Sequence, residues 1–173
     1  CGMKLNNTYI SGYGHFAGEL GHLSTGNSNA VCRCGGVGCL EAVASLTAIA
    51  QKAQSAAKNS SSILLGKKNF TGVDVLKAAS QNDKLALRIV DEAFEYLAAA
   101  VAGLVNILSP QMVIFDNIIN EAGADVVAML MRSLRKNILI SHRRQLEMRI
   151  SSLKSHIGAI GGAAAVLDNC LAG

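Results

Sequence analysis

A spacing of metal-binding residue types within residues 19–41 limits what this chain can fold into more than any other feature. His22 is followed by Cys32, Cys34 and Cys39, which gives the pattern H-x9-C-x-C-x4-C. Three thiolates and one imidazole suit tetrahedral Zn²⁺, and the glycines between them permit the tight turns that aim four side chains at one point. Unrelated core or surface residues rarely cluster in this way, so we predict a zinc knuckle. Because all four ligand positions are filled, the zinc should be structural.

Length and composition are those of one globular domain. The chain has 173 residues, of which 50% are hydrophobic, so enough apolar surface exists for a core. The longest uncharged run, residues 96–115, is interrupted by Asn106, Ser109 and Pro110, which argues against a membrane span. Five cysteines are an odd number for a disulfide framework, and no signal peptide is visible. We therefore expect residues 1–173 to be a single cytoplasmic domain.

Hydrophobic periodicity divides the chain into strands and helices. Asn6 and Asn7 tolerate positive φ and should turn a hairpin between strands at residues 3–5 and 8–10. The alternation of strand and helix toward the C-terminus indicates an α/β layered domain, with ligands outside the carboxyl ends of the strands. Apolar residues at helical spacing predict helices from 40 onward, at 71–80, 83–108 and 121–136, and from 158 to 171. A short apolar run predicts a buried strand at 112–115, and alternation of polar and apolar residues predicts an edge or second parallel strand at 147–151.

Two other clusters have plain interpretations. The net charge of +4 is too small by itself to indicate nucleic-acid binding. The basic residues that cluster near the C-terminus should lie on a solvated helix end and loop. The glycines at 158, 161 and 162 could admit a phosphate to a helix N-terminus, but close helix packing is the favoured interpretation. The clustered basic residues are Arg132, Arg135, Lys136, His142, Arg143, Arg144, Arg149 and Lys154.

The metal-ligand region also resembles a known signature. The runs A-G-E-L-G-H at 17–22 and C-R-C-G-G-V-G-C-L-E at 32–41 are similar to the motif of the ROK family, which contains bacterial sugar kinases and sugar-responsive repressors. This resemblance implies the C-terminal domain of an actin-like, ribonuclease H-like ATPase-type fold with an inserted zinc-binding loop. It also implies that the chain covers about the C-terminal half of such a protein.

The resemblance gives roles to three polar residues. Taken alone, Glu19 and Glu41 could be two solvated surface carboxylates, although both are tied to the metal loop. In the resembled family, the positions of Glu19, His22 and Glu41 contact sugar hydroxyls. His22 would then give one ring nitrogen to zinc and the other to the sugar.

The same resemblance separates two functions. In ROK kinases the phosphate loop and the catalytic aspartate lie upstream of the matched region, so this chain should not phosphorylate a sugar alone. A paired glycine commonly follows the strand at 112–115 in those kinases. Here Asp116 and Asn117 stand in its place and would crowd and repel a nucleotide. Residues 106–115 also look more like the repressor branch.

Our first hypothesis is therefore the effector-sensing and oligomerisation part of a ROK-type repressor. It would bind a sugar or sugar phosphate, form a homodimer or homotetramer, and reach DNA only through a domain missing from this chain. The alternative is the C-terminal half of a ROK ATP-dependent hexose or N-acylhexosamine kinase. A third possibility is a degenerate fragment that keeps only the zinc fold and the oligomer interface.

Overall fold

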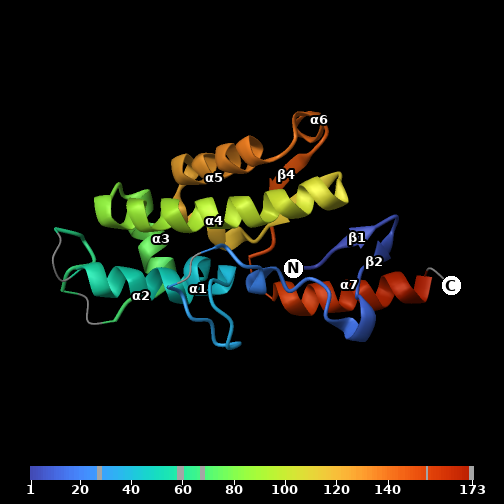
Figure 1. Ribbon diagram of the computed structural model, residues 1–173, viewed down its shortest axis with the longest axis horizontal. Coiled ribbons are helices and arrows are strands. Elements are labelled where there is room, and N and C mark those ends of the chain that lie inside the picture. Colours follow the sequence, from blue (N-terminus) through green and yellow to red (C-terminus); the bar gives the residue numbers. More distant parts are fainter. Residues whose placement is uncertain (27–28, 58–60, 67–68, 155, 172–173) are drawn as a thin grey trace.

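Helices make up most of the structure and pack around one long central helix (Figure 1). The computed structural model describes residues 1–173 except 27–28, 58–60, 67–68, 155 and 172–173. The strands are β1 (Lys4–Leu5), β2 (Thr8–Tyr9), β3 (Met112–Phe115) and β4 (Glu147–Ile150). The α-helices are α1 (Leu40–Ala44), α2 (Leu46–Ala57), α3 (Gly72–Ser80), α4 (Lys84–Leu108), α5 (Ala124–Asn137), α6 (Ile140–Arg143) and α7 (Ile157–Leu171). Three 3-10 turns are η1 (Tyr13–His15), η2 (Leu20–His22) and η3 (Asn117–Ala122).

The N-terminal hairpin is confirmed. β1 pairs antiparallel with β2, and Asn6 and Asn7 turn the chain with φ angles of 47° and 63°. Asparagine tolerates this left-handed region better than most residues do, which is why the pair makes a two-residue turn.

The helix predicted from residue 40 onward is two helices. Ser45 separates α1 from α2 with an extended backbone, at ψ 158°. Its hydroxyl accepts a hydrogen bond from the N–H of Ala48 at 3.1 Å and so caps the start of α2. Apolar periodicity runs through both helices, which is why it did not locate the break.

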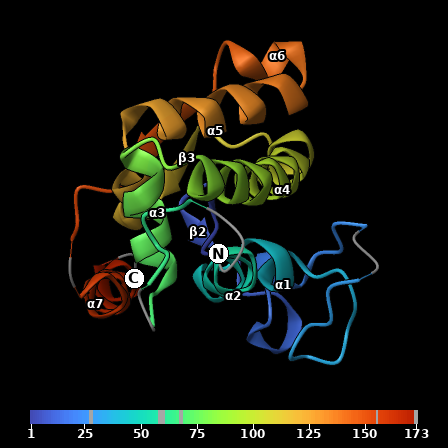
Figure 2. The ribbon, with the colours of Figure 1, turned by 90° about the vertical axis from the view of Figure 1, so that its left-hand side faces the viewer.

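The central helix α4 is confirmed, and it lies between α5 on one side and α1 and α2 on the other (Figure 2). Asp83 caps its N-terminus, and Ser109 ends it in a left-handed conformation immediately before Pro110. The buried core lies between these helices and is almost entirely aliphatic. Its largest fully buried side chains are Leu64, Leu76, Ile89, Leu130, Leu134, Val75, Val90 and Val105.

The two C-terminal strands are confirmed as a parallel pair, in which Met112 is opposite Glu147 and Phe115 is opposite Ile150. The expectation that the first of them is buried is only partly right, because Ile114 is 62% exposed. The helix predicted at 121–136 begins later, at Ala124. Gly123, with φ 85°, separates it from η3, and a side chain there would be strained.

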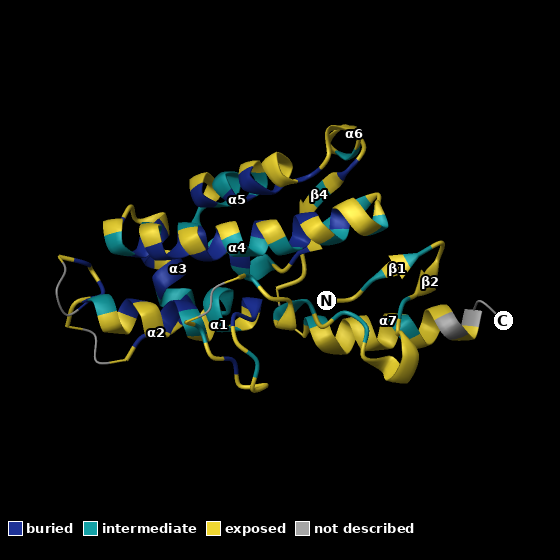
Figure 3. Ribbon diagram, in the orientation of Figure 1, coloured by how far each residue is buried: buried dark blue, intermediate teal, exposed yellow. Residues whose placement is uncertain are grey.

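The last helix lies on the outside of the structure, and Figure 3 shows most of α7 as exposed. Close packing at its glycines is not seen among the described residues, since an added Cβ at Gly158, Gly161 or Gly162 would meet no atom within 4 Å. The C-terminal basic side chains are mostly exposed, as expected for a solvated surface. In the described part of the chain, no helix is both long enough and apolar enough to cross a membrane.

Candidate metal and sugar site

The structure brings the four predicted metal ligands together. The candidate ligand atoms of His22, Cys32, Cys34 and Cys39 all lie within 4.8 Å of one another. The sulfur of Cys32 is 3.8 Å from Nδ1 of His22, and the sulfurs of Cys34 and Cys39 are 3.7 Å apart. Ligand atoms around tetrahedral zinc, with Zn–S bonds of about 2.3 Å, are separated by about 3.8 Å. The two measured separations match this value, and the four ligand atoms together span at most 4.8 Å, so their arrangement is consistent with a Zn²⁺ site.

Backbone hydrogen bonds hold this cluster in a tight loop. The N–H of Cys32 donates to the carbonyl of Gly36 at 2.8 Å, and the N–H of Gly35 donates back to the carbonyl of Cys32 at 3.0 Å. Gly35 and Gly38 have φ angles of 88° and 76°, which favour glycine. Cys39 is also the N-cap position of α1, so one ligand is fixed to the start of a helix. Residues 27–28 of the predicted knuckle lie outside the described residues.

The cysteine environments differ. Burial raises the pKa of the Cys39 thiol to about 11, with further contributions from the neighbouring sulfurs of Cys34 and Cys32. The backbone N–H of Gly36, 3.4 Å from the sulfur of Cys34, is the main cause of a lowered pKa at that thiol. Zinc binding to this loop would release the thiol protons of these cysteines, because a cysteine binds metal as the thiolate.

Three polar side chains gather beside the metal cluster. His22 turns Nδ1 toward Cys32, while its Nε2 lies 3.7 Å from Oε2 of Glu19. Glu41, in the first turn of α1, lies next to the same 3-10 turn. A Cβ built at Gly21 would be 3.5 Å from its carboxylate oxygen Oε2. All three side chains are exposed and could meet a ligand.

The chain order alone does not bring Glu41 to η2. The N–H of Leu40 donates to the carbonyl of Leu23 at 2.9 Å, which joins the start of α1 to the residue after η2. Ser24 and Cys39 form an isolated antiparallel bridge at the same place. The metal loop thus closes on itself and places Glu41 beside the turn that carries Glu19 and His22.

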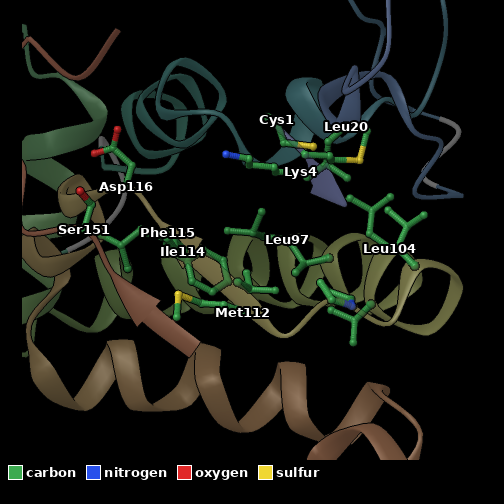
Figure 4. A pocket seen from close by; sticks show the side chains of 18 of the residues that line it. Cys1, Lys4, Leu20, Leu97, Leu104, Met112, Ile114, Phe115, Asp116 and Ser151 are labelled. Carbon is green, nitrogen blue, oxygen red and sulfur yellow. The ribbon is translucent and has the colours of Figure 1, made fainter. Parts of the chain in front are cut away.

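A separate cavity of about 670 Å³ was not predicted from the sequence. Its lining comes from the N-terminal hairpin, the second half of α4, and β3, and it is mainly apolar (Figure 4). Asp116 and Ser151, at the carboxyl ends of β3 and β4, form one end of it. The carboxylate of Asp116 accepts a hydrogen bond from the N–H of Ile118 at 2.9 Å, so Asp116 also caps η3.

Comparison with known proteins identifies the family to which this arrangement corresponds. The sequence model described as "ROK family" matches residues 1–169. The chain belongs to the ROK family. Its fold is therefore one half of the actin-like ATPase fold of ROK proteins, an α/β structure, and its His/Cys cluster is typical of the ROK zinc motif.

The relatives include both kinases and repressors. A glucokinase of Halalkalibacterium halodurans is 34% identical over 167 residues, covering 93% of this chain and 51% of that protein. A glucokinase of Thermotoga maritima is 32% identical over 172 residues, covering 96% of this chain and 54% of that protein. A xylose repressor of Caldicellulosiruptor bescii is 28% identical over 174 residues, covering 98% of this chain and 44% of that protein. This ROK chain thus spans about half the length of the curated relatives it matches.

Solved structures agree on the fold. A ROK family transcriptional regulator described as a homolog of the E. coli MLC protein superposes with a TM-score of 0.82 at 27% identity, covering 90% of this chain and 39% of that one. A ROK family glucokinase from Streptomyces griseus, solved with glucose and AMPPNP, gives a TM-score of 0.79 at 25% identity, covering 95% of this chain and 55% of that one. The two branches of the ROK family therefore share this half of the fold.

Proposed function

We propose that this chain is the effector-sensing and oligomerisation part of a ROK-type transcriptional repressor. In this proposal Glu19, His22 and Glu41 bind a sugar or sugar phosphate, and a structural Zn²⁺ is held by His22, Cys32, Cys34 and Cys39. The main observation in support of this proposal is the orientation of the His22 ring. One ring nitrogen faces the sulfur of Cys32, and the other faces Glu19.

This orientation gives the three residues complementary hydrogen-bonding roles. When Nδ1 of His22 binds a metal, Nε2 retains its proton and becomes a fixed donor. The carboxylates of Glu19 and Glu41 are acceptors only. A sugar hydroxyl both donates and accepts, so one rigid donor near two acceptors suits neighbouring hydroxyl groups.

The metal would hold the sugar-binding residues in place and would take no part in a chemical reaction. Three sulfurs and one imidazole complete a tetrahedral shell and leave no position for substrate or water. A bound Zn²⁺ would instead fix the His22 ring and, through Cys39, the start of α1 that carries Glu41. The sugar-binding residues would then be held by the same loop that binds the metal.

The end of β3 supports the repressor branch over the kinase branch. A nucleotide must bring its phosphates close to backbone N–H groups, which is easiest where glycine leaves space. Here Asp116 occupies that position, and it is committed to capping η3 through Ile118. Its negative charge would repel a phosphate.

A second candidate is the C-terminal half of a ROK sugar kinase. The sequence identities favour this candidate, because the two glucokinases are 34% and 32% identical to this chain and the xylose repressor is 28% identical. DNA binding belongs to the repressor proposal only. DNA contact would need residues outside these 173.

Calorimetric titration with glucose, N-acetylglucosamine and xylose tests the sugar site. We expect one of these sugars to bind, and Glu19→Gln and Glu41→Gln each to weaken that binding by about tenfold or more. A hydrogen bond to a charged group contributes about 1.5–3 kcal/mol. Glu147→Gln on β4 is the matched control and should bind normally. Zinc content, measured on the same samples, should be unchanged in all three variants.

The same titrations, repeated on the whole polypeptide that the gene encodes, separate the two candidates, because the phosphate loop of a kinase would lie upstream of residues 1–173. The repressor proposal expects no binding of the ATP analogue AMPPNP with Mg²⁺, before or after the sugar is added. Tight AMPPNP binding would instead favour the kinase. Sugar binding that is equal in wild type, Glu19→Gln and Glu41→Gln would refute the proposed sugar site.

A further inference from the structure

The three cysteines of the metal loop differ in their access to solvent. Cys32 and Cys39 are only 5% and 4% exposed, whereas Cys34 is an exposed residue. Figures 1 and 2 both show the loop between η2 and α1 standing out from the helices, on the side away from α5. An oxidant in solution therefore reaches Cys34 more easily than the other two cysteines.

The geometry favours one disulfide partner for Cys34. Its sulfur lies 3.7 Å from the sulfur of Cys39, while the sulfur of Cys32 lies 3.8 Å from Nδ1 of His22. Cys32 and Cys34 are separated by a single residue, and such close neighbours in sequence rarely reach the geometry of a disulfide. Cys39 is therefore the partner that Cys34 would bond.

The backbone between these two cysteines is able to follow such a change. Residues 34–39 read C-G-G-V-G-C, so three of the four residues in between are glycine and lack a side chain that would resist movement. The two sulfurs would have to approach from 3.7 Å to about 2.05 Å. Cys39 is fixed at the start of α1, so Cys34 is the residue that would move.

Gly36 leaves the two sulfurs uncovered on one side. A Cβ built at Gly36 would lie 3.4 Å from the sulfur of Cys34 and 3.4 Å from the sulfur of Cys39. This is an ordinary van der Waals distance, and the backbone of Gly36 lies outside the left-handed region. Alanine would therefore fit at this position and would shield both sulfurs, which glycine leaves open to small molecules.

We propose that Cys34 is an oxidation site, at which hydrogen peroxide converts Cys34 and Cys39 into a disulfide. The Cys34 thiolate attacks one peroxide oxygen, the O–O bond breaks, and the other oxygen leaves with a proton as water. The sulfur of Cys39 then attacks the sulfenic sulfur of Cys34. The S–S bond forms, the S–O bond breaks, and the hydroxyl group leaves with a proton as a second water. The two sulfurs lose two electrons, which reduce the peroxide.

This disulfide and a bound Zn²⁺ exclude each other. Sulfurs that share a tetrahedral zinc are about 3.8 Å apart, whereas bonded sulfurs are about 2.05 Å apart and are no longer thiolates. Oxidation would leave His22 and Cys32 as the remaining ligands, so the loop would release its metal and rebind it after reduction. The inference concerns the cysteines of the loop and does not depend on the proposed sugar binding.

Peptide mass spectrometry tests this inference on the whole polypeptide that the gene encodes. The protein is treated with hydrogen peroxide, the remaining thiols are alkylated, and trypsin is added. Trypsin cleaves after Arg33 and Lys52, which places Cys34 and Cys39 in one peptide and Cys32 in another. We expect the first peptide to lose two hydrogen atoms and to take up no alkyl group. A chromogenic chelator should detect one Zn²⁺ released per disulfide, and a dithiol reductant should reverse both changes.

Two pairs of variants sharpen the measurement. Cys34→Ser should give no disulfide within the peptide, whereas Cys170→Ser, at an exposed cysteine of α7, is the matched control and should oxidise as the wild type does. Gly36→Ala should keep its zinc and form the disulfide about threefold or more slowly, because its methyl group covers both sulfurs. Gly103→Ala, which has open space around the added Cβ, is the control for this substitution and should react at the wild-type rate.

Two results would overturn the inference. One is full alkylation of Cys34 and Cys39 after peroxide treatment, and the other is a disulfide to Cys32, which would join two tryptic peptides. A disulfide between Cys34 and Cys39 in protein that holds no zinc would support the oxidation site while refuting the metal site. The two conclusions can therefore fail separately.

Discussion

At the scale of single residues, Asp83 is the acidic side chain that joins two parts of the chain. It is 7% exposed, and its two carboxylate oxygens accept hydrogen bonds from different segments. One bond comes from the N–H of Ala86, at 2.9 Å, and caps α4. The other comes from the N–H of Ile63, at 2.8 Å. Through these two hydrogen bonds, Asp83 links the preceding loop to the start of the central helix.

Replacing Asp83 by alanine should lower the free energy of unfolding by about 1–3 kcal/mol, because two backbone N–H groups lose their acceptor. Urea denaturation measures this loss. Asp91→Ala, in the middle of α4, is the control and should change stability little, since alanine is the better helix former. Equal effects of the two substitutions would contradict the capping role.

The same residue predicts a dependence on pH. Burial acts to raise the pKa of Asp83, but hydrogen bonds from Ala86, Ile63 and Ser62 outweigh it and hold the pKa below its ordinary value of 3.8. A carboxyl with a lowered pKa in the folded state stabilises the fold at neutral pH, and it loses that contribution as the pH falls below 3.8. The stability difference between wild type and Asp83→Ala should therefore narrow in that acidic range.

At the scale of elements, two helical glycines have opposite surroundings. Gly72 begins α3, and a Cβ there would lie 2.7 Å from the carbonyl carbon of Leu46, at the start of α2, and closer still to its oxygen. Gly103, in α4, has open space where a Cβ would be. Helix propensity alone favours alanine at both positions. The packing of α2 against α3 reverses this expectation at Gly72.

Gly103→Ala should therefore raise the free energy of unfolding by about 0.5–1 kcal/mol, through helix propensity. Gly72→Ala should lower it by about 1–3 kcal/mol, because backbone atoms of α2 must move. Urea denaturation of both variants gives the comparison. If both substitutions stabilised the protein, that result would contradict the close contact between α2 and α3.

At the scale of the whole molecule, the metal cluster and the main hydrophobic core are separate. Cys32 and Cys39 are buried, but neither belongs to the aliphatic cluster formed by α2, α3, α4 and α5. Leu20 and Ala44, which lie beside the metal loop and pack against this core, are only partly buried. Metal removal should therefore act locally.

We expect one Zn²⁺ per chain, and its removal by EDTA should speed amide exchange about tenfold or more in residues 20–26 and 29–44. The amides at the centre of α4 should keep their protection, because the core around Val90 is intact. Cys34→Ser should reproduce the effect without chelator, whereas Cys170→Ser, at an exposed cysteine of α7, should not. Loss of protection throughout α4 on chelation would show that the metal holds the whole fold. Absence of zinc from freshly reduced protein would refute the metal site itself.

Features that depend on near neighbours could be predicted from the sequence. The ligand pattern from His22 to Cys39, the Asn6–Asn7 turn and the end of the long helix shortly before Pro110 follow from residue types a few positions apart, and all three arrangements are present. An apolar run identified β3, and the alternation of polar and apolar residues identified β4. The α/β class follows from the order of these elements.

Features that depend on distant segments became visible only in the folded chain. The break at Ser45, the place of Glu41 beside Gly21 and the contact that Gly72 makes with Leu46 involve no repeating pattern. The strand edges that β1 and β3 leave unpaired among the described residues are likewise invisible in a sequence. Residue types show that a strand forms, but whether its N–H and C=O groups are satisfied depends on which chain segments fold beside it.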